Sequence, residues 1–369
     1  MSIAPIYYND FQQEPEALIQ AGLEAAEAVF RSGSWVLGPK VEAFEQAWAA
    51  RCGSAAAVGV ANGLDAIDIG LRALGIGPGD EVITTALTAY ATTLAIQRCG
   101  ATPVFAEIDP ATACLDPIAV ERCISRATRA VLVVHLYGRA AALTELHAIC
   151  KQHELLLLED CAQAHGALHA GRPVGSIGSF GAWSFYPTKN LGTIGDAGAL
   201  TSSDIGLLAK ARQLRNYGQC DRYNHDLVGL NSRLDELQAA LLLERIVYLQ
   251  TWNERRCTVA QQYWAAIHNS ALETLQQPVD PASHVHHLFV LRTAKREEFQ
   301  THLHHVGLKA LIHYPVPCHR QQALSHHRID PNGLAITEHH CATCVSLPTH
   351  PFLNDTETAR IIGACNSFS

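Results

Sequence analysis

The sequence predicts an α/β fold with a large, mostly parallel sheet and a smaller α+β domain after it. Short apolar, β-branched runs alternate with helical patterns from about residue 55 to residue 203, and this rhythm fades after about residue 250. Such alternation implies crossover connections, which place helices on both faces of the sheet. With 48% hydrophobic and 17% charged residues, the 369-residue chain has an ordinary globular composition.

Seven short runs are candidate strands: Ala56–Val60, Glu81–Thr85, Thr102–Ala106, Ala130–His135, Leu155–Glu159, Ala182–Phe185 and Ala197–Thr201. Helical patterns lie between several of them, such as Leu64–Leu74 and Ala142–His153. The stretches 131–134 and 155–158 are apolar at every position, which is typical of strands that are buried on both faces.

One long helix is expected after the last strand. Leu234, Leu237, Leu241 and Arg245 recur at spacings of three and four, and the pattern continues to about Gln250. Beyond that point the share of His, Gln and Pro rises. The sequence therefore predicts a large domain with an N-terminal arm at residues 1–250 and a small domain at residues 251–369.

Charge and hydropathy exclude several classes of protein. The formal charge of −8 and the pI near 6.2 argue against a nucleic-acid-binding surface. No apolar run approaches the roughly 20 residues that span a membrane. Residues 1–10 lack the pattern of a targeting segment, so the cytosol is the expected compartment.

Cysteine and histidine patterns predict no metal site. The twelve cysteines are scattered, and the single C-x-x-C, Cys341–Cys344, has no second pair to complete a zinc site. Reduced, mostly buried thiols are expected. The twenty histidines crowd the last third without a His-Glu-x-x-His. They are interpreted as a His-rich surface of the small domain, with one or two lining a substrate pocket as the alternative.

An anion site is one interpretation of the segment Ala61–Ala66. Gly63 follows a candidate strand and begins a helix, where free backbone N–H groups and the helix dipole attract a phosphate. A plain glycine turn with Asn62 as helix cap explains the segment equally well.

Asp160 lies at the carboxyl end of a buried strand, where open parallel sheets bind their ligands. A buried carboxylate is costly without a partner. A protonated ring nitrogen would be such a partner, and capping of the next element is the alternative.

Lys189 follows another candidate strand in Ser184-Phe185-Tyr186-Pro187-Thr188-Lys189. Its aromatic, proline and glycine surroundings would disfavour the ammonium form and leave an amine that can attack a carbonyl. Ser184 offers a hydroxyl five residues away. A surface lysine in a loop is the alternative.

The segment 229–240 predicts a capped helix start. Asn231 or Ser232 can cap this helix, and Asp235 and Glu236 would fall in its first turn. A phosphate cradle, a buried aspartate and an activated lysine together indicate pyridoxal 5'-phosphate (PLP), in which the ring serves as an electron sink.

The chain resembles the DegT/DnrJ/EryC1/StrS family of sugar aminotransferases over nearly its whole length. Six segments match in order: Gly33–Pro39, Gly77–Ile83, Glu159–Gly166, Ser184–Asn190, the segment around Asn231, and Ser346–Pro348. The resemblance implies the PLP-dependent transferase fold type I, with a mostly parallel mixed sheet flanked by helices and a smaller α+β C-terminal domain. It also implies a homodimer that shares its active sites.

The resemblance implies a role for each matching residue. Lys189 would form the Schiff base and move protons, Asp160 would pair with the pyridine nitrogen, and Gln163 would lie near the ring. The phosphate would be held by Gly63, Leu64, Ser184 and, from the neighbouring subunit, Asn231. The substrate would meet Trp35, His313 and Tyr314.

Two positions depart from the family pattern. Leu64 stands where the family commonly has threonine, so only its backbone N–H remains for the phosphate. Ala89 stands where an aromatic usually covers the pyridine ring. Either the neighbouring Tyr90 stacks on the ring or another group covers it.

By this resemblance the protein moves an amino group from L-glutamate (or glutamine) to a nucleotide-linked keto sugar, a dTDP-3-keto-6-deoxyhexose. The alternatives are a keto-inositol or a UDP-linked keto sugar as acceptor. A further alternative is a pyridoxamine-phosphate-dependent sugar 3-dehydratase, but such enzymes carry histidine where this chain has Lys189. A regulatory relative without turnover is disfavoured by the intact Lys189 and Asp160.

Overall fold

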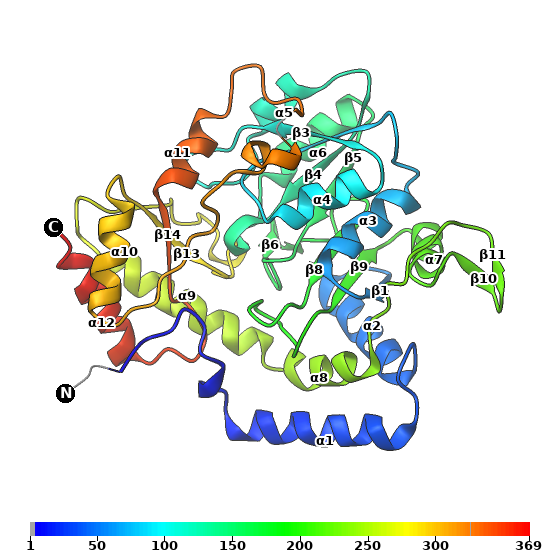
Figure 1. The fold of residues 1–369 in the computed structure, drawn as a ribbon, viewed down its shortest axis with the longest axis horizontal. Coiled ribbons are helices and arrows are strands. Elements are labelled where there is room, and N and C mark those ends of the chain that lie inside the picture. Colours follow the sequence, from blue (N-terminus) through cyan, green and yellow to red (C-terminus); the bar gives the residue numbers. More distant parts are fainter. Residues whose placement is uncertain (1–3, 325) are drawn as a thin grey trace.

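A seven-stranded sheet forms the centre of the computed structural model, which describes residues 4–324 and 326–369 (Figure 1). In spatial order its strands are β1 (Ala56–Val60), β9 (Gly198–Ser202), β8 (Gly181–Ser184), β5 (Leu156–Asp160), β4 (Thr128–Val134), β2 (Glu81–Thr85) and β3 (Thr102–Ala106). Strands β8, β5, β4, β2 and β3 are parallel neighbours. Strand β9 is antiparallel to both β1 and β8, so the sheet is mixed, as predicted.

Helices cover both faces of this sheet. One face packs against α2 (Pro39–Cys52), α5 (Pro117–Cys123), α6 (Leu143–Gln152) and α8 (Glu236–Ile246). The other face packs against α3 (Gly63–Ala73), α4 (Tyr90–Arg98) and α7 (Ile205–Leu214). Successive residues of β4 alternate between the two cores, with Val131 and Val133 in the first and Ala130 and Leu132 in the second. This explains why the run is apolar at every position.

A small antiparallel sheet forms a second centre, with strand order β12 (Glu273–Thr274), β13 (Phe289–Arg292) and β14 (Cys344–Leu347). Its core includes residues of α9 (Leu249–Ala266), α10 (Arg296–His305) and α12 (Asp355–Asn366). Ile6 pairs with Leu308 and is buried in the same core, so the N-terminal segment lies against this part of the chain. Residue 250, after which we expected a domain boundary, is the second residue of α9, and the division into two domains stays a prediction.

The remaining elements are short or peripheral. Helix α1 (Glu16–Ser32) lies along α8, and α11 (Ala335–Thr343) precedes β14 (Figure 1). Two small hairpins pair β6 (Leu168–His169) with β7 (Arg172–Pro173) and β10 (Gln219–Asp221) with β11 (Asn224–His225). Single 3-10 turns lie at Phe11–Gln13, Leu136–Gly138, Pro281–Ser283, Cys318–Arg320 and Gln322–Leu324. Within the described residues, no helix has the length and apolar character needed to cross a membrane.

The prediction of one long helix to about Gln250 is wrong. The chain forms two helices, α8 and α9, separated at Val247 and Tyr248. At the break Tyr248 donates its backbone N–H to the Arg245 carbonyl at 3.0 Å, a bond over three residues instead of four. Because Leu249 continues the apolar spacing on the far side, the hydrophobic pattern carried no sign of the break.

The interpretation of the C-terminal histidines as a surface is wrong for several of them. His284, His286, His287 and His340 are between 1% and 7% exposed. Burial lowers the pKa of His286 and His340 to about 3, so these rings are neutral. They pack as aromatic groups; the His284 and His286 rings, for example, stack with centroids 3.8 Å apart.

Candidate active site

Asp160 ends β5 at the carboxyl edge of the parallel strands, as predicted, and is 6% exposed. Its Oδ2 accepts a hydrogen bond of 2.7 Å from the Thr92 hydroxyl, and its Oδ1 accepts one of 3.1 Å from the Ala162 N–H. Thr92 lies one turn after Thr88, and the two hydroxyls are 2.8 Å apart. These two donors fix the carboxylate in one orientation.

Lys189 lies in the loop between β8 and β9, close enough to Asp160 for the two charges to interact. Burial lowers the pKa of Lys189 to about 8, although the Asp160 carboxylate partly offsets this effect. An ordinary lysine has a pKa of about 10.4 and is almost fully protonated near neutral pH. Lys189 therefore has a larger share of free amine, which is the form that attacks a carbonyl.

The beginning of α3 lies directly against Ser184. Asn62 caps the helix by accepting the Asp65 N–H at 2.8 Å. A Cβ on Gly63 would come within 2.7 Å of the Ser184 Cβ, so only glycine permits this approach. The N–H groups of Gly63 and Leu64 belong to the first helical turn, which has no intrahelical acceptors for them. Together with the Ser184 hydroxyl they form a cradle that suits a phosphate.

Gln163 connects the large sheet to the loop that carries His313 and Tyr314. Its Oε1 accepts the Tyr137 N–H at 2.6 Å, and its Nε2 donates to the Tyr314 oxygen at 3.1 Å. The Tyr137 hydroxyl donates to the His313 carbonyl at 2.6 Å. Burial, together with the nearby Lys189 ammonium, lowers the pKa of His313 to about 4, so this ring is neutral. The predicted residues Gln163, His313 and Tyr314 therefore lie around Lys189 and Asp160.

Trp35 and Asn231 are not brought to Lys189 within this chain. Trp35 is 62% exposed and contacts α8 through its carbonyl, which accepts the Glu236 N–H at 3.2 Å. Asn231 is exposed and pairs with Asn216 in an isolated bridge. The expectation that Asn231 or Ser232 begins the helix is wrong, because α8 starts at Glu236.

The reason for that later start is visible in the hydrogen bonds. The Ser232 hydroxyl accepts the Ala61 N–H at 3.1 Å, which holds this segment beside the strand end instead of in a helix. The Glu236 carboxylate accepts the N–H groups of Gly38, Lys40 and Val41. It therefore caps the neighbouring helix α2 rather than its own.

Tyr90 is the first residue of α4, directly after Ala89. It is partly buried against a small apolar cluster that consists of Ala86, Phe105, Cys318, Leu324 and Leu334. These contacts partly bury the Tyr90 side chain. That the Tyr90 ring stacks on the cofactor stays a prediction.

Several residues that contact this site were missed from the sequence. Thr92 could have been found, because it lies in the first turn of α4, two residues after Tyr90, which was predicted to stack on the ring. Tyr137 and the fully buried His165 carry no local signal. The His165 ring packs among Trp48, Trp183 and Phe185, and burial lowers its pKa to about 3.

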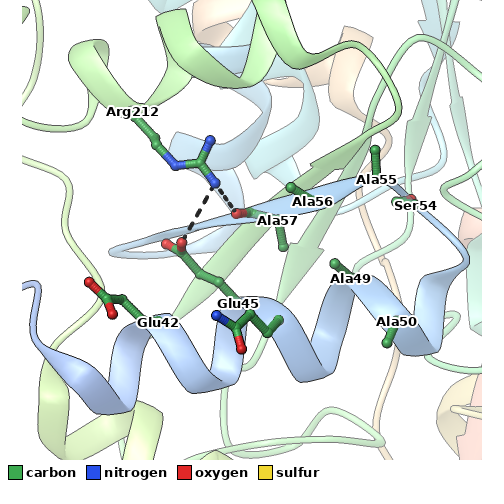
Figure 2. A pocket seen from close by; sticks show the side chains of 10 residues that line it. Glu42, Glu45, Ala49, Ala50, Ser54, Ala55, Ala56, Ala57 and Arg212 are labelled. Atoms are coloured by element: carbon green, nitrogen blue, oxygen red, sulfur yellow. Dashed lines mark hydrogen bonds and ion pairs between the residues drawn. The ribbon is translucent and has the colours of Figure 1, made fainter.

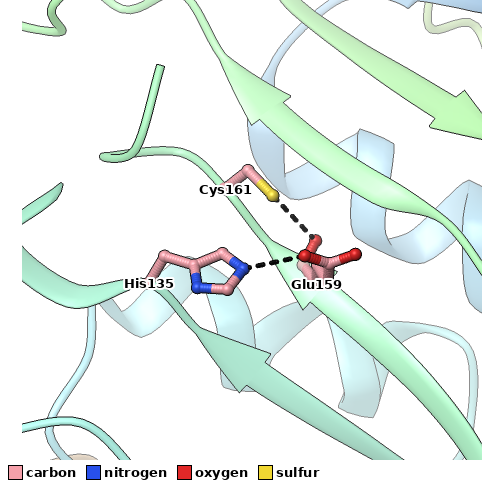
Figure 3. A group of neighbouring side chains, drawn as sticks. All are labelled: His135, Glu159 and Cys161. Carbon is pink, nitrogen blue, oxygen red and sulfur yellow. Dashed lines mark hydrogen bonds and ion pairs between the residues drawn. The ribbon is translucent and has the colours of Figure 1, made fainter. Parts of the chain in front are cut away.

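A second polar cluster lies next to the site, formed by His135, Glu159 and Cys161 (Figure 3). The His135 Nδ1 accepts the Ala141 N–H at 3.1 Å, so its proton is on Nε2, which donates to Glu159 at 3.0 Å. Both ring nitrogens are thus engaged, and neither has a free lone pair for a metal ion. The geometry of this trio is explained by hydrogen bonding alone.

A separate hollow near the surface lies between α2 and the edge strand β1 (Figure 2). Arg212 reaches across it, donating to the Ala57 carbonyl at 3.2 Å and lying 3.9 Å from Glu45. The open space is about 490 Å³. Alanines form much of its wall, and its polar residues are Glu42, Glu45, Gln46, Ser54 and Arg212.

The geometry around Lys189 fits PLP. A glycine cradle at a helix start suits its phosphate, a fixed carboxylate at the sheet edge suits its pyridinium nitrogen, and an amine of lowered pKa suits its aldehyde. This combination defines a PLP-dependent transferase.

Comparison with known proteins assigns the family. The model of the DegT/DnrJ/EryC1/StrS aminotransferase family matches residues 17–366. The chain belongs to this family and is a PLP-dependent aminotransferase, as the six sequence segments had indicated.

Two curated relatives are similar to this chain over nearly its whole length. The dTDP-3-amino-3,4,6-trideoxy-alpha-D-glucose transaminase of Streptomyces venezuelae is 41% identical, over 98% of this chain and 94% of that protein. The dTDP-3-amino-3,6-dideoxy-alpha-D-galactopyranose transaminase of Aneurinibacillus thermoaerophilus is 43% identical, over 94% of each chain.

Two solved structures share the fold. DesV of S. venezuelae, solved in complex with a ketimine intermediate, superposes with a TM-score of 0.94 at 41% identity and covers 99% of this chain and 98% of its own. NtdA of Bacillus subtilis, solved with pyridoxamine phosphate, has a TM-score of 0.90 at 28% identity and covers 99% of this chain and 85% of its own. The predicted fold type I architecture is confirmed.

Proposed function

We propose that this aminotransferase moves an amino group from L-glutamate, or glutamine, to the keto carbon of a dTDP-3-keto-6-deoxyhexose. The observation that carries the proposal is the Lys189 amine of lowered pKa beside the fixed Asp160 carboxylate. The two curated relatives described above, which both carry names of dTDP-sugar transaminases, support the substrate class.

The roles of the residues follow from their positions. PLP, when bound, supplies an electron sink and carries the amino group between the two substrates. The Asp160 carboxylate, held by Thr92 and the Ala162 N–H, would keep a proton on the ring nitrogen. The Lys189 amine would remove a proton from the amino-bearing carbon and would return it to the carbon on the other side of the nitrogen. Gly63, Leu64 and Ser184 would hold the phosphate.

Gln163, through its contact with Tyr314, positions the ring and the substrate-binding loop together. His313 and Tyr314 would line the sugar side of the pocket. Because burial keeps His313 neutral, it can orient a sugar hydroxyl without placing a second cation beside Lys189.

We also propose that the enzyme works as a cytoplasmic homodimer in which Asn231 and Trp35 complete the site of the partner subunit. Both residues are exposed in the single chain. Exposed apolar side chains lie near the active-site loop, with Tyr186 50% and Ile194 70% exposed. Apolar surface of this kind favours association with a second copy.

The substrate assignment is tested with purified holoenzyme, L-glutamate and three acceptors: a dTDP-3-keto-6-deoxyhexose, a UDP-linked 3-keto sugar and a keto-inositol. Mass spectrometry of the products should show amination of the dTDP sugar at a kcat/KM well above the other two. Preference for either other acceptor would overturn the assignment. Dehydration of the sugar without amination would favour the dehydratase alternative.

The shared site is tested by mixing two inactive chains, Lys189→Ala and a cofactor-deficient Asn231→Asp. One site of each mixed dimer would combine Lys189 and Asn231 of the natural sequence, so activity should return on mixing. Mixed dimers that form but stay inactive would contradict the shared site. Each variant alone, taken through the same dissociation and mixing, is the control.

A further inference from the structure

A narrow cavity beside Lys189 lies where five segments meet. The N-terminal segment around Asp10, the β8–β9 loop, α8, α9 and the loop after β14 all line it, and both Lys189 and Arg256 are in its wall. The cavity offers about 30 Å³ to atoms of the size of a water molecule. That is room for about two such atoms. It suits a carboxylate group and is far too small for a nucleotide.

Arg256 is a buried cation without a counter-charge. It is 4% exposed, and its Nη1 donates to the carbonyls of Thr349 at 3.0 Å and His287 at 3.5 Å. Its Nε has no hydrogen-bond partner. In the part of the chain that the structure describes, no carboxylate lies within ion-pair distance of it. Burial lowers the pKa of Arg256 to about 10. This direction is expected for a buried cation that has no carboxylate beside it.

The other charged groups of the same cavity are already paired. Arg245 forms an ion pair with Glu14, with 3.0 Å between Nη1 and Oε2. The Asp10 carboxylate accepts the Gln12 N–H at 3.1 Å and the Gln13 Nε2 at 3.0 Å. A buried charge without a partner is costly, so the unpaired guanidinium is the exception that needs an explanation.

Neighbouring groups supply further donors but no negative charge. The Tyr8 hydroxyl is buried without a hydrogen-bond partner. Burial raises the pKa of Tyr8, while the nearby Arg256 guanidinium opposes this rise, so the phenol stays protonated. His350 also lines the cavity, and burial lowers its pKa to about 4. Arg256, Tyr8 and His350 therefore present one cation and neutral polar groups, while the two carboxylates of the cavity, Asp10 and Glu14, are held by Gln12, Gln13 and Arg245.

We propose that Arg256, assisted by the Tyr8 hydroxyl, binds the α-carboxylate of the amino donor; this inference rests on the proposed transamination. In an α-amino acid the nitrogen and the carboxylate are attached to the same carbon. The group that binds the carboxylate must therefore lie beside the reacting nitrogen, and Arg256 shares a cavity wall with Lys189. A carboxylate there supplies the counter-charge that the chain itself lacks.

The test compares two donors that load the holoenzyme with the same amino group. L-Glutamate brings a carboxylate, whereas the aminated dTDP sugar, reacting in reverse, has no α-carboxylate. Each reaction is followed alone by the change in cofactor absorbance. Loss of a charged hydrogen bond in Arg256→Met should lower kcat/KM for L-glutamate by about 10- to 100-fold. The reaction with the amino sugar should change less than about threefold.

Two further variants keep the result interpretable. Arg255 precedes Arg256 on α9 but faces away, pairing with Asp355 at 3.0 Å, so Arg255→Met is the matched control and should affect neither donor. If Arg256→Met does not bind the cofactor, Arg256→Lys takes its place and should show a smaller loss that is still confined to L-glutamate.

Each outcome decides one question. An equal loss with both donors would show that Arg256 only supports the fold through its two carbonyl contacts, and would overturn the inference. An unchanged rate with L-glutamate would overturn it as well. If the natural enzyme accepts an amino group from neither donor, the proposed function itself fails.

Discussion

Glu159 and Asp160 are adjacent acidic residues at the end of β5, but their surroundings in the structure differ. Glu159 is fully buried, and its two oxygens accept four hydrogen bonds, from His135 and from the N–H groups of Gly175, Ile177 and Gly178. Asp160, on the other side of the strand, accepts bonds from Thr92 and Ala162 and lies beside Lys189. A strand turns successive side chains to opposite faces, so one dipeptide serves both stability and chemistry.

The difference shows how to separate a structural carboxylate from a functional one. Around Glu159 every hydrogen-bonding position is used within the chain. Although burial opposes it, the His135 and backbone donors hold the pKa of Glu159 below its ordinary value. Asp160 accepts hydrogen bonds from Thr92 and Ala162, which leaves acceptor capacity for a ligand, and burial destabilises the nearby Lys189 as a cation. Buried polar groups that remain incompletely partnered need an explanation, and for Arg256 we propose a substrate carboxylate.

The largest effect is expected for Glu159→Gln. The neutral amide cannot accept four bonds as a carboxylate does, and its NH₂ would face backbone N–H groups. We expect a loss of about 3–5 kcal/mol in the free energy of unfolding. Chemical denaturation measures this loss, with the exposed Glu121→Gln as the control. The remaining folded molecules should keep turnover within about threefold, and a purely catalytic defect at normal stability would refute the structural role.

Asp160→Asn should lower turnover and leave the stability of the fold nearly unchanged. The amide cannot hold a proton on the ring nitrogen, so the electron sink is weakened. By analogy with other lost electrostatic stabilisers, we expect kcat to fall by roughly 10²-fold or more. Steady-state kinetics and a denaturation curve together test this, and the unfolding free energy should change by less than about 1 kcal/mol. Turnover near that of the natural enzyme would remove Asp160 from the mechanism.

The smallest effect concerns the charge of Lys189 in the protein without cofactor. With a pKa of about 8 in the folded chain and about 10.4 in the unfolded chain, the unfolded chain binds more protons between these values. Stability should therefore rise with pH across this window, and the cost of the buried charge is fully present below pH 8. Lys189→Met should be more stable by about 2–3 kcal/mol at pH 7, and this difference should shrink toward pH 10.5. A difference that does not vary with pH would contradict the lowered pKa.

Local patterns in the sequence predicted most of the fold. The seven strands of the main sheet lie within two residues of their expected bounds, because each is a short apolar run between turn-forming residues. Lys189 and Asp160 were found because each follows such a run. The break between α8 and α9 was missed because the apolar spacing continues across it.

Other features depend on contacts between distant segments. Asn231 sits outside α8 because Ser232 bonds to Ala61, a partner about 170 residues away that no local pattern reveals. The buried histidines were taken for surface because a neutral imidazole looks polar in a sequence and packs like an aromatic ring in a core. Arg256 and Tyr8 lie far apart in the sequence, so their proximity could be found only in three dimensions.

The most direct test of the account is to find which lysine carries the cofactor. The chain has six lysines, and the five others are Lys40, Lys151, Lys210, Lys295 and Lys309. Borohydride reduction of the holoenzyme, followed by proteolysis and mass spectrometry, locates the attached group. We expect the label on Lys189 alone, and Lys189→Ala should take up none. A label on any other lysine of the natural enzyme would contradict the site described here.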